Sequence, residues 1–224
     1  MTMKRSDFAA TIDHTYLKIH RSDAEVRRLC LEAEKYGFAS VAVFPVAVPL
    51  AASMLGGTGV EVCVALGFHL GGYPPELKAH ETEDAIRNGA TEVDLVMNVA
   101  AAKAERWDLL QEEFERFREA AGDCVAKIIL ETCLLKDEEK AHACRIAKAA
   151  GLDYVKTSTG YKKGATVPDV KQMNSIVAPD LKVKASGGIR TLDDALAMLD
   201  AGASRLGTSA GASLMKAFDE RFGG

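Results

Sequence analysis

The sequence predicts a single (β/α)8 barrel over residues 1–224, preceded by a short extra N-terminal helix. Helical and strand patterns alternate in about eight units, and strict alternation calls for a parallel sheet. Four helical patterns end at a glycine, and a strand pattern follows each within three residues: Gly37, Gly89, Gly151 and Gly202. An open doubly wound sheet is the alternative, but 224 residues without a Ser- or Pro-rich linker favour one closed barrel.

The individual elements follow from their periodicity, in chain order. A short leading helix precedes a weak first strand near residues 11–13. Apolar residues at three- and four-residue spacing predict helices at 23–35, 76–88, 105–121, 138–150 and 191–201. Thr191 and Asp194 are a typical N-terminal cap for the last of these helices. The β-rich runs that predict the remaining strands lie within 36–44, 60–65, 88–96, 125–131, 150–156, 181–184 and 201–207.

Composition limits the class of protein. Hydrophobic residues make up 48% and charged residues 27%, as in ordinary globular proteins. The net charge of −4 provides no overall field that attracts nucleic acid or anionic lipid, and no apolar run is long enough to span a bilayer. The five cysteines are scattered and have no CxxC spacing, which indicates reduced thiols and a cytoplasmic location.

Two lysines are the most informative residues. Lys156 and Lys184 each end a short apolar run and are followed by a glycine-containing turn. If their strands are neighbours, two ammonium groups share one pocket and each lowers the pKa of the other. A lysine with a lowered pKa is a nucleophile that forms a Schiff base with a carbonyl group. The alternative is that both are ordinary surface lysines at loop starts.

The repeated glycines give a common register for four strands. Counting five residues from each capping glycine leads to Ala42, Asp94, Lys156 and Gly207. We therefore expect Asp94 and Lys156 at equivalent depths near the C-terminal strand ends, where active sites of this fold lie. Asp94 could instead be only the partner of a structural ion pair.

Glycines and hydroxyls gather where later strands turn into helices. Gly187 and Gly188 follow the predicted seventh strand, Gly207 and Ser209 close the eighth, and Gly160 ends the loop after Lys156. Free N–H groups at helix starts bind phosphate, and the loops after strands seven and eight often form such a site in barrels. Plain tight turns are the alternative.

Other polar residues carry less information. Glu131 and Thr132 end the predicted fifth strand and could orient groups in the same mouth. His14 could line the pocket or be a structural histidine, and the histidines have no metal-ligand spacing. No Walker A or GxGxxG motif is present, so the sequence does not support a bound nucleotide.

Six segments together resemble the deoxyribose-phosphate aldolase family in order and spacing, essentially from end to end. They are Ile12-Asp-His-Thr15, Glu92-Val-Asp-Leu-Val96, Leu130-Glu-Thr-Cys-Leu134, Val155-Lys-Thr-Ser-Thr-Gly160, Val183-Lys-Ala-Ser-Gly-Gly-Ile-Arg-Thr191 and Gly207-Thr-Ser209. The resemblance implies a class I aldolase that needs no metal or cofactor and cleaves 2-deoxyribose 5-phosphate to glyceraldehyde 3-phosphate and acetaldehyde. It also implies that Lys156 forms the Schiff base, Lys184 lowers its pKa, and Asp94 relays protons. Relatives of this kind are commonly dimers, so we expect a homodimer or higher homo-oligomer.

Four positions depart from the usual pattern of that family. The stretch after the third strand reads Gly67-Phe-His-Leu-Gly71 instead of Gly-Phe-Pro-x-Gly, and the loop after Lys156 contains Tyr161-Lys-Lys163 instead of a glycine-rich run. Ala210 stands where the last loop has a second serine, and Phe222-Gly-Gly224 lacks the C-terminal tyrosine of some members. None of these changes alters the three charged positions.

Two other functions fit the same residues. A different Schiff-base lyase of phosphosugars would share the lysines and the glycine loops. A barrel that binds a phosphorylated ligand without catalysis would leave Lys156 unmodified and with an ordinary pKa.

Overall fold

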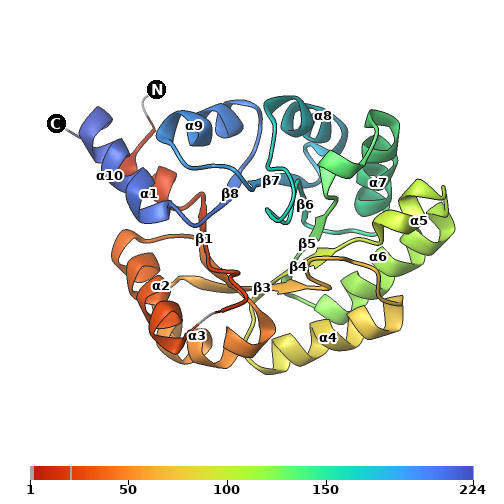
Figure 1. Ribbon diagram of the computed structural model, residues 1–224, viewed down its shortest axis with the longest axis horizontal. Helices are drawn as coiled ribbons and strands as arrows, with labels where there is room; N and C mark the ends of the chain where they lie inside the picture. Colours follow the sequence, from red (N-terminus) through yellow and green to blue (C-terminus); the bar gives the residue numbers. More distant parts are fainter. Residues whose placement is uncertain (1–2, 21, 224) are drawn as a thin grey trace.

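The computed structural model describes residues 3–20 and 22–223; Met1, Thr2, Arg21 and Gly224 of the predicted domain lie outside the described residues. A ring of parallel strands stands at the centre, with helices around it (Figure 1). The strands pair in sequence order, and β8 pairs with β1, so the barrel is closed and the open-sheet alternative is excluded. The strands are β1 Ile12–Thr15, β2 Ser40–Val43, β3 Glu61–Leu66, β4 Glu92–Val96, β5 Val125–Ile129, β6 Tyr154–Lys156, β7 Lys182–Ser186 and β8 Arg205–Thr208.

The helices follow the strands in alternation. They are α1 Arg5–Ala9, α2 Asp23–Tyr36, α3 Val48–Leu55, α4 Pro75–Arg87, α5 Val99–Lys103, α6 Trp107–Ala121, α7 Asp137–Ala149, α8 Val167–Val177, α9 Leu192–Asp200 and α10 Gly211–Phe222, with short 3-10 turns at Pro45–Ala47 and Thr132–Leu134. The leading helix α1 lies against α10 (Figure 1), where Phe8 stacks on Phe218 with ring centroids 4.8 Å apart. Among the helices of the described residues, none combines the length and apolar character that a membrane crossing requires.

The capping signals of the sequence are confirmed. All four predicted glycines adopt positive φ, from 68° at Gly151 to 108° at Gly202, a region that side chains with a Cβ rarely occupy. Thr191 caps α9 by accepting a hydrogen bond from the Asp194 amide, and the Asp194 carboxylate reaches back to the Thr191 amide. These stops fix where each following strand begins.

The two faces of the strands differ in chemistry. In β4, Val93 and Leu95 belong to the apolar core between the strands and the helices, whereas the alternate residues Glu92 and Asp94 carry buried charges. The same alternation places Val183 in that core and Lys184 on the opposite face. The hydrophobic core therefore surrounds the barrel, and charged side chains occupy the barrel interior.

One strand boundary differs from the prediction in a way that matters for the site. The sequence predicted that Lys184 ends its strand, but β7 continues to Ser186. The extension is held because the Ser186 amide donates to Thr157 Oγ1 at 3.0 Å and Ser186 Oγ donates to the Ser158 carbonyl at 2.5 Å. Lys156 is the last residue of β6, whereas Lys184 lies two residues before the end of β7.

Candidate active site

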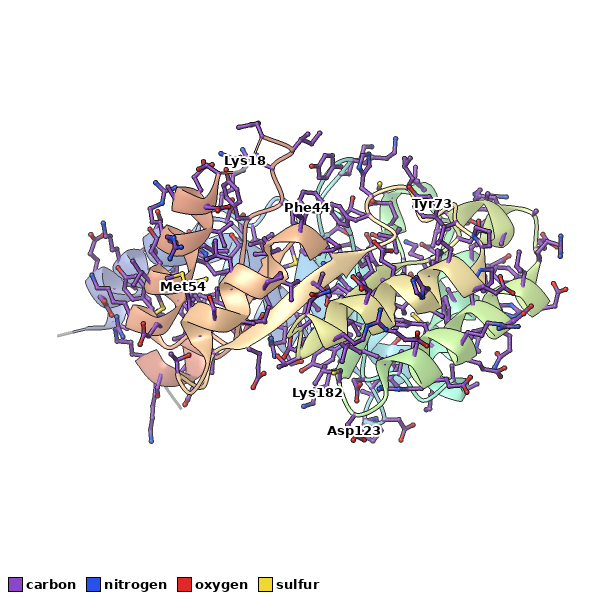
Figure 2. All side chains as sticks on the ribbon, turned by 90° about the horizontal axis from the view of Figure 1, so that it is seen from below. Lys18, Phe44, Met54, Tyr73, Asp123 and Lys182 are labelled. Atoms are coloured by element: carbon purple, nitrogen blue, oxygen red, sulfur yellow. The ribbon has the colours of Figure 1, made fainter. Side chains whose placement is uncertain are left out.

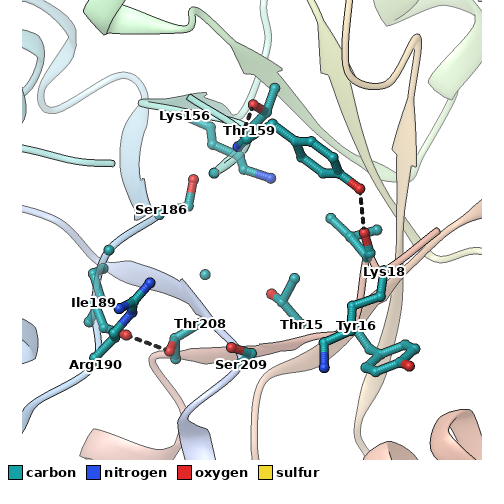
Figure 3. Close-up of a pocket in the computed structure, with 16 residues that line it drawn as sticks. Thr15, Tyr16, Lys18, Lys156, Thr159, Ser186, Ile189, Arg190, Thr208 and Ser209 are labelled. Atoms are coloured by element: carbon teal, nitrogen blue, oxygen red, sulfur yellow. Dashed lines mark hydrogen bonds between the residues drawn. The ribbon is translucent and has the colours of Figure 1, made fainter. Parts of the chain in front are cut away.

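A cavity of about 240 Å³ opens at the C-terminal ends of the strands, formed by the loops that follow β1, β6, β7 and β8. Figure 2 shows the barrel from the side, with Lys18 and Phe44 after β1 and β2 at one end and Asp123 and Lys182 at the other. Lys156 lines the cavity, and so do all five predicted phosphate-loop residues: Gly160, Gly187, Gly188, Gly207 and Ser209 (Figure 3). The structure thus brings the predicted lysine and the predicted loops into one site.

Of the two predicted lysines, Lys156 is the one that lines the cavity. Its side chain is only 4% exposed, and its Nζ donates to Asp94 Oδ2 at 2.7 Å. Burial lowers the pKa of Lys156; the Asp94 carboxylate opposes this effect, the ammonium of Lys184 adds to it, and the net result is a lowered pKa. A lowered pKa increases the fraction of neutral amine, which is the nucleophilic form.

Lys184 lies beside Lys156 in the sheet but in different surroundings. The two residues are Cα partners across β6 and β7, and Lys184 is fully buried without lining the cavity. Its Nζ lies 2.5 Å from Asp13 Oδ2 and 2.6 Å from Asp94 Oδ2.

The expectation that each lysine lowers the pKa of the other is therefore wrong for Lys184. Burial acts to lower the pKa of Lys184, but the carboxylates of Asp13 and Asp94 outweigh it and raise that pKa above its ordinary value. Lys156 contacts one carboxylate and Lys184 contacts two. Lys184 is thus protonated in the resting site, and its positive charge lowers the pKa of Lys156.

Asp94 joins the two lysines through a single oxygen. Its Oδ2 accepts hydrogen bonds from both Lys156 and Lys184, and its Oδ1 lies 3.1 Å from the Nζ of Lys127. Burial acts to raise the pKa of Asp94, but the three ammonium groups hold it well below its usual range. Asp94 is therefore a carboxylate on which both lysine side chains converge, since one of its oxygens accepts from both.

The buried charges below Asp94 were not predicted from the sequence. Lys127 on β5, Glu92 on β4 and Arg205 on β8 form ion pairs in the barrel interior, and Asp13 on β1 contacts both Arg205 and Lys184. Their sequence signal is a charged residue within an otherwise apolar strand, as at the alternate positions Glu92 and Asp94 of β4.

Glycines are required where the loops after β6 and β7 approach each other. A Cβ at Gly164 would lie 2.1 Å from the carbonyl oxygen of Gly187, and one at Gly187 would lie 2.9 Å from the Cα of Gly164. Gly207 leaves room for Lys184, because a Cβ there would meet Lys184 Cε at 3.4 Å and Ser186 Cβ at 2.8 Å. At Gly187 and Gly207 the cavity wall is therefore formed by backbone atoms.

The sequence predicted free N–H groups at the helix starts after β7 and β8, and the start of α9 differs from this expectation. At the start of α9, the amides of Arg190 and Thr191 donate to the Asp194 carboxylate and are not free. The helix α10, which begins two residues after Ser209, has no side-chain cap. Its first-turn N–H groups lack intrahelical partners, as at any helix start.

Two cations at the rim of the cavity were missed. Lys18 and Arg190 line it from opposite sides, on the loops after β1 and β7, and both are exposed (Figure 3). Lys162 and Lys163 are also exposed but do not line the cavity, which fits the view that they are only solvated. The positive charge at the rim thus comes from two loops. The loop after β7 was predicted only as a glycine loop, and the loop after β1 was not predicted to contribute charge.

Side-chain contacts join the loops after β1, β3, β5 and β6 around the mouth. Glu131 Oε2 accepts from Thr159 Oγ1 at 2.5 Å, so the expectation that Glu131 orients groups of the mouth is confirmed. Tyr161, which lines the cavity, donates from its hydroxyl to the Leu17 carbonyl at 2.7 Å, and its ring stacks on His69 with centroids 4.3 Å apart. The two departures from the family pattern at His69 and Tyr161 thus contact each other.

His14 is a structural residue. It is 2% exposed, its Nε2 lies 2.7 Å from Glu32 Oε2 on α2, and it does not line the cavity. Its ring also packs edge-on against Phe38. The reading of His14 as a pocket residue is therefore wrong, because β1 directs this side chain toward the helices.

Comparison with known proteins adds independent information. The sequence model of one protein family, described as DeoC/LacD family aldolase, matches residues 6–217. A deoxyribose-phosphate aldolase of Streptococcus sanguinis is 52% identical over 92% of this chain and 94% of its own length, and one of Bacillus subtilis is 53% identical over 93% and 94%. The tetrameric deoxyribose phosphate aldolase structure from Aeropyrum pernix superposes with a TM-score of 0.91 and 33% identity, covering 97% of this chain and 93% of that one.

Proposed function

The chain belongs to the DeoC/LacD family of aldolases, and from this premise we propose that it cleaves 2-deoxyribose 5-phosphate reversibly to glyceraldehyde 3-phosphate and acetaldehyde. It is a class I aldolase, which forms a Schiff base between a lysine and the substrate aldehyde. One observation supports the assignment of that lysine above all others. Lys156 reaches the cavity, has a lowered pKa, and shares one Asp94 oxygen with a protonated Lys184.

The first half of the reaction forms the covalent intermediate. The neutral amine of Lys156 attacks the C1 aldehyde and gives a carbinolamine. Loss of its hydroxyl as water gives an iminium ion, and Lys184 and Asp94 supply and collect the protons that this step requires. Asp94 Oδ2 is suited to this exchange because both lysine nitrogens donate to it, at 2.7 and 2.6 Å.

The second half breaks the carbon–carbon bond. The C3 hydroxyl loses its proton, the C2–C3 bond breaks, and its electron pair moves toward the iminium ion. Glyceraldehyde 3-phosphate leaves, and a two-carbon enamine remains on Lys156. Protonation of the enamine carbon restores an iminium ion, and one water hydrolyses it to acetaldehyde and free Lys156. The water that is lost in the first half is thus regained, and no redox step is involved.

The rim of the cavity holds the phosphate in this proposal. Gly160, Gly187, Gly188, Gly207 and Ser209 form the wall, and Lys18 and Arg190 add positive charge. Fixing the phosphate fixes the position of C1 relative to Lys156, which lowers the entropic cost of the attack. Ala210 carries no hydroxyl where the family pattern has a second serine, and α10 retains its uncapped N-terminus.

Reductive trapping tests the proposal directly. Incubation with acetaldehyde and sodium cyanoborohydride should convert the lysine that forms the Schiff base to an ethyl-lysine, which peptide mass spectrometry locates. We expect rapid ethylation of Lys156 and loss of this fast adduct in Lys156→Ala, whereas the exposed control Lys163→Ala should be trapped at Lys156 as the wild type is. Exposed lysines should react slowly in all three proteins. An adduct at the active site of Lys156→Ala would contradict the assignment.

A substrate panel separates this aldolase from the other two functions. Preference for 2-deoxyribose 5-phosphate over other phosphosugars distinguishes it from a different Schiff-base lyase. Loss of the phosphate group should raise KM more than it lowers kcat, because phosphate contacts act mainly in binding. Failure to trap any aldehyde would favour a barrel that only binds its ligand.

The assembly and location of the protein are also part of the proposal. We propose one catalytic domain that forms a homodimer or a higher homo-oligomer, supported by the tetrameric relative from Aeropyrum pernix. A cytoplasmic location is supported by the five cysteines, all of which are free thiols. Its substrates are a small phosphosugar and small aldehydes, with no role for nucleic acid or membrane.

A further inference from the structure

Six charged side chains inside the barrel form a closed ring of alternating sign. From Asp94, ion pairs lead to Lys127 at 3.1 Å, then to Glu92 at 2.6 Å and to Arg205 at 2.9 Å. Arg205 pairs with Asp13, Asp13 pairs with Lys184 at 2.5 Å, and Lys184 returns to Asp94 at 2.6 Å. Each member thus contacts two neighbours of opposite charge.

The ring is buried and electrically neutral. Its three carboxylates balance its three cations, and the most exposed of these side chains, Arg205, is only 12% exposed. The ionised state is favoured for both signs. Burial acts to raise the pKa of Asp13, but Lys184 and Arg205 lower it to about 2. Burial acts to lower the pKa of Lys127, but Asp94 and Glu92 among others raise it well above its usual range.

Lys156 is attached to this ring but is not a member of it. Its ion-pair partner is Asp94, which already has Lys127 and Lys184 as neighbours. A protonated Lys156 therefore adds one positive charge to a buried group that is already balanced, whereas a neutral Lys156 leaves the balance intact. An uncompensated charge in a buried site is expensive.

We propose that Lys127, Glu92 and Arg205, which do not line the cavity, are positioning residues that set the protonation state of Lys156 through the charge balance of the ring. The inference rests on Lys156 as the Schiff-base lysine. It assigns a function to the buried charges of the barrel interior. Apolar side chains could pack this space equally well, so packing alone does not require charges there. The ring keeps Asp94 ionised and Lys184 protonated, so that Lys156 is the group whose proton is lost most readily.

Asp94, Lys184 and Cys63 act directly on Lys156, and the other charged or titratable groups of the barrel interior lie on the strands around it. Tyr154 is on its own strand, and Cys63 on β3 lies 3.7 Å from Lys127 Nζ and 3.9 Å from Lys184 Nζ. Burial raises the pKa of Cys63 to about 12, so this thiol is neutral and does not enter the balance. The charged groups are Asp13, Glu92, Asp94, Lys127, Lys184 and Arg205.

Two substitutions of opposite sign test the proposal through the acidic limb of the pH profile of kcat/KM. Activity rises with pH as Lys156 loses its proton, so this limb reports the pKa of Lys156 in the free enzyme. Glu92→Gln removes a negative charge and should move the limb to lower pH. Lys127→Met removes a positive charge and should move it to higher pH. At an effective dielectric constant near 20, each shift is about one pH unit.

Charge compensation gives the decisive variant. The double substitution Glu92→Gln/Lys127→Met makes the ring neutral again, and its limb should return to within about 0.5 unit of the wild type, since the two charge effects cancel. If the substitutions acted only by damaging the packing, their effects would add in the double variant. The two single variants would then not move the acidic limb in opposite directions. The matched control is Lys182→Met, which removes an exposed lysine on the same strand face as Lys184, and its limb should not move.

A further variant keeps the test decisive if the buried substitutions fail to fold. Arg205→Gln removes a positive charge from the most exposed member, and its limb should move to higher pH, as for Lys127→Met. Trapping of wild-type Lys156 by acetaldehyde is measured first, because its failure would refute the proposed function itself. If the wild type is trapped but the limbs stay in place or all move in one direction, only the charge-balance inference is overturned.

Discussion

The ends of β6 and β7 are neighbouring regions that place the same residue type in opposite states. Lys156 ends its strand, lines the cavity and contacts one carboxylate, and its pKa is lowered. Lys184 is two residues short of the end of its strand, fully buried between two carboxylates, and its pKa is raised. Burial acts alike on both, so the number of anionic partners decides which lysine has a lowered pKa and which has a raised one.

Removing Lys156 should break this comparison most completely. Lys156→Ala leaves no amine at the cavity floor, and we expect turnover of 2-deoxyribose 5-phosphate to fall by roughly 10⁴-fold or more. Steady-state kinetics with a coupled assay for glyceraldehyde 3-phosphate measures the loss. Lys162→Ala, an exposed lysine outside the cavity, serves as the control and should keep its activity. A loss below tenfold would mean that another residue forms the Schiff base.

Removing Lys184 should damage both stability and rate. Lys184→Met leaves Asp13 and Asp94 without a shared cation, which should cost about 3–5 kcal/mol of unfolding free energy. We expect kcat to fall by about 10²–10⁴-fold through impaired proton transfer. The pKa of Lys156 should rise, because a neighbouring positive charge is gone.

Urea unfolding and the pH profile of kcat/KM check these effects of Lys184→Met. The acidic limb should move to higher pH, since neutral Lys156 is the reactive form. A limb that moves to lower pH would show that Lys184 does not act on Lys156 as a positive charge.

Neutralising Asp94 should separate Schiff-base formation from turnover. Asp94→Asn removes the anion that opposes the lowering of the pKa of Lys156, so that pKa should fall further and trapping by acetaldehyde should persist at lower pH. Turnover should fall by about 10²-fold, because the oxygen between the two lysines no longer accepts protons. Equal losses in trapping and turnover would contradict the relay role.

A smaller effect is expected in the loops that we propose hold the phosphate. Gly164→Ala places a Cβ 2.1 Å from the Gly187 carbonyl oxygen and forces the two loops apart, at a cost of about 1–3 kcal/mol. We expect a roughly tenfold rise in KM with a smaller change in kcat, if half or more of that cost appears in binding. Gly72→Ala, where a Cβ would meet nothing within 4 Å, is the matched control. An unchanged KM would remove this loop contact from the account of phosphate binding.

The sequence predicted the residues at the C-terminal strand ends because the signals that mark them are local. Each capping glycine fixes the start of a strand, and the register from it leads to Asp94 and Lys156, which lie 2.7 Å apart. The glycines of the later loops were likewise found, and they line the cavity. Such signals need no knowledge of which strands are neighbours across the barrel.

The buried ion pairs of the barrel interior could not be predicted in the same way. The pairing of Arg205 with Asp13 depends on closure of β8 against β1, at opposite ends of the sequence. The position of Lys184 was set too high because β7 is extended by bonds from Ser186 to the loop after β6, which the sequence of β7 alone does not reveal. The helices α3 and α8 were also missed, although Pro49 and Pro168 are typical of a helix start.

The most direct test of the central claim measures the two lysines in one experiment as a function of pH. Wild-type protein is treated with acetaldehyde and cyanoborohydride at a series of pH values, and ethylation at Lys156 and Lys184 is quantified by peptide mass spectrometry. The account predicts that Lys156 is modified with a midpoint well below the ordinary lysine pKa of about 10.4, whereas Lys184 stays unmodified in the folded protein. Ethylation at Lys184, or a Lys156 midpoint at the ordinary value, would contradict it.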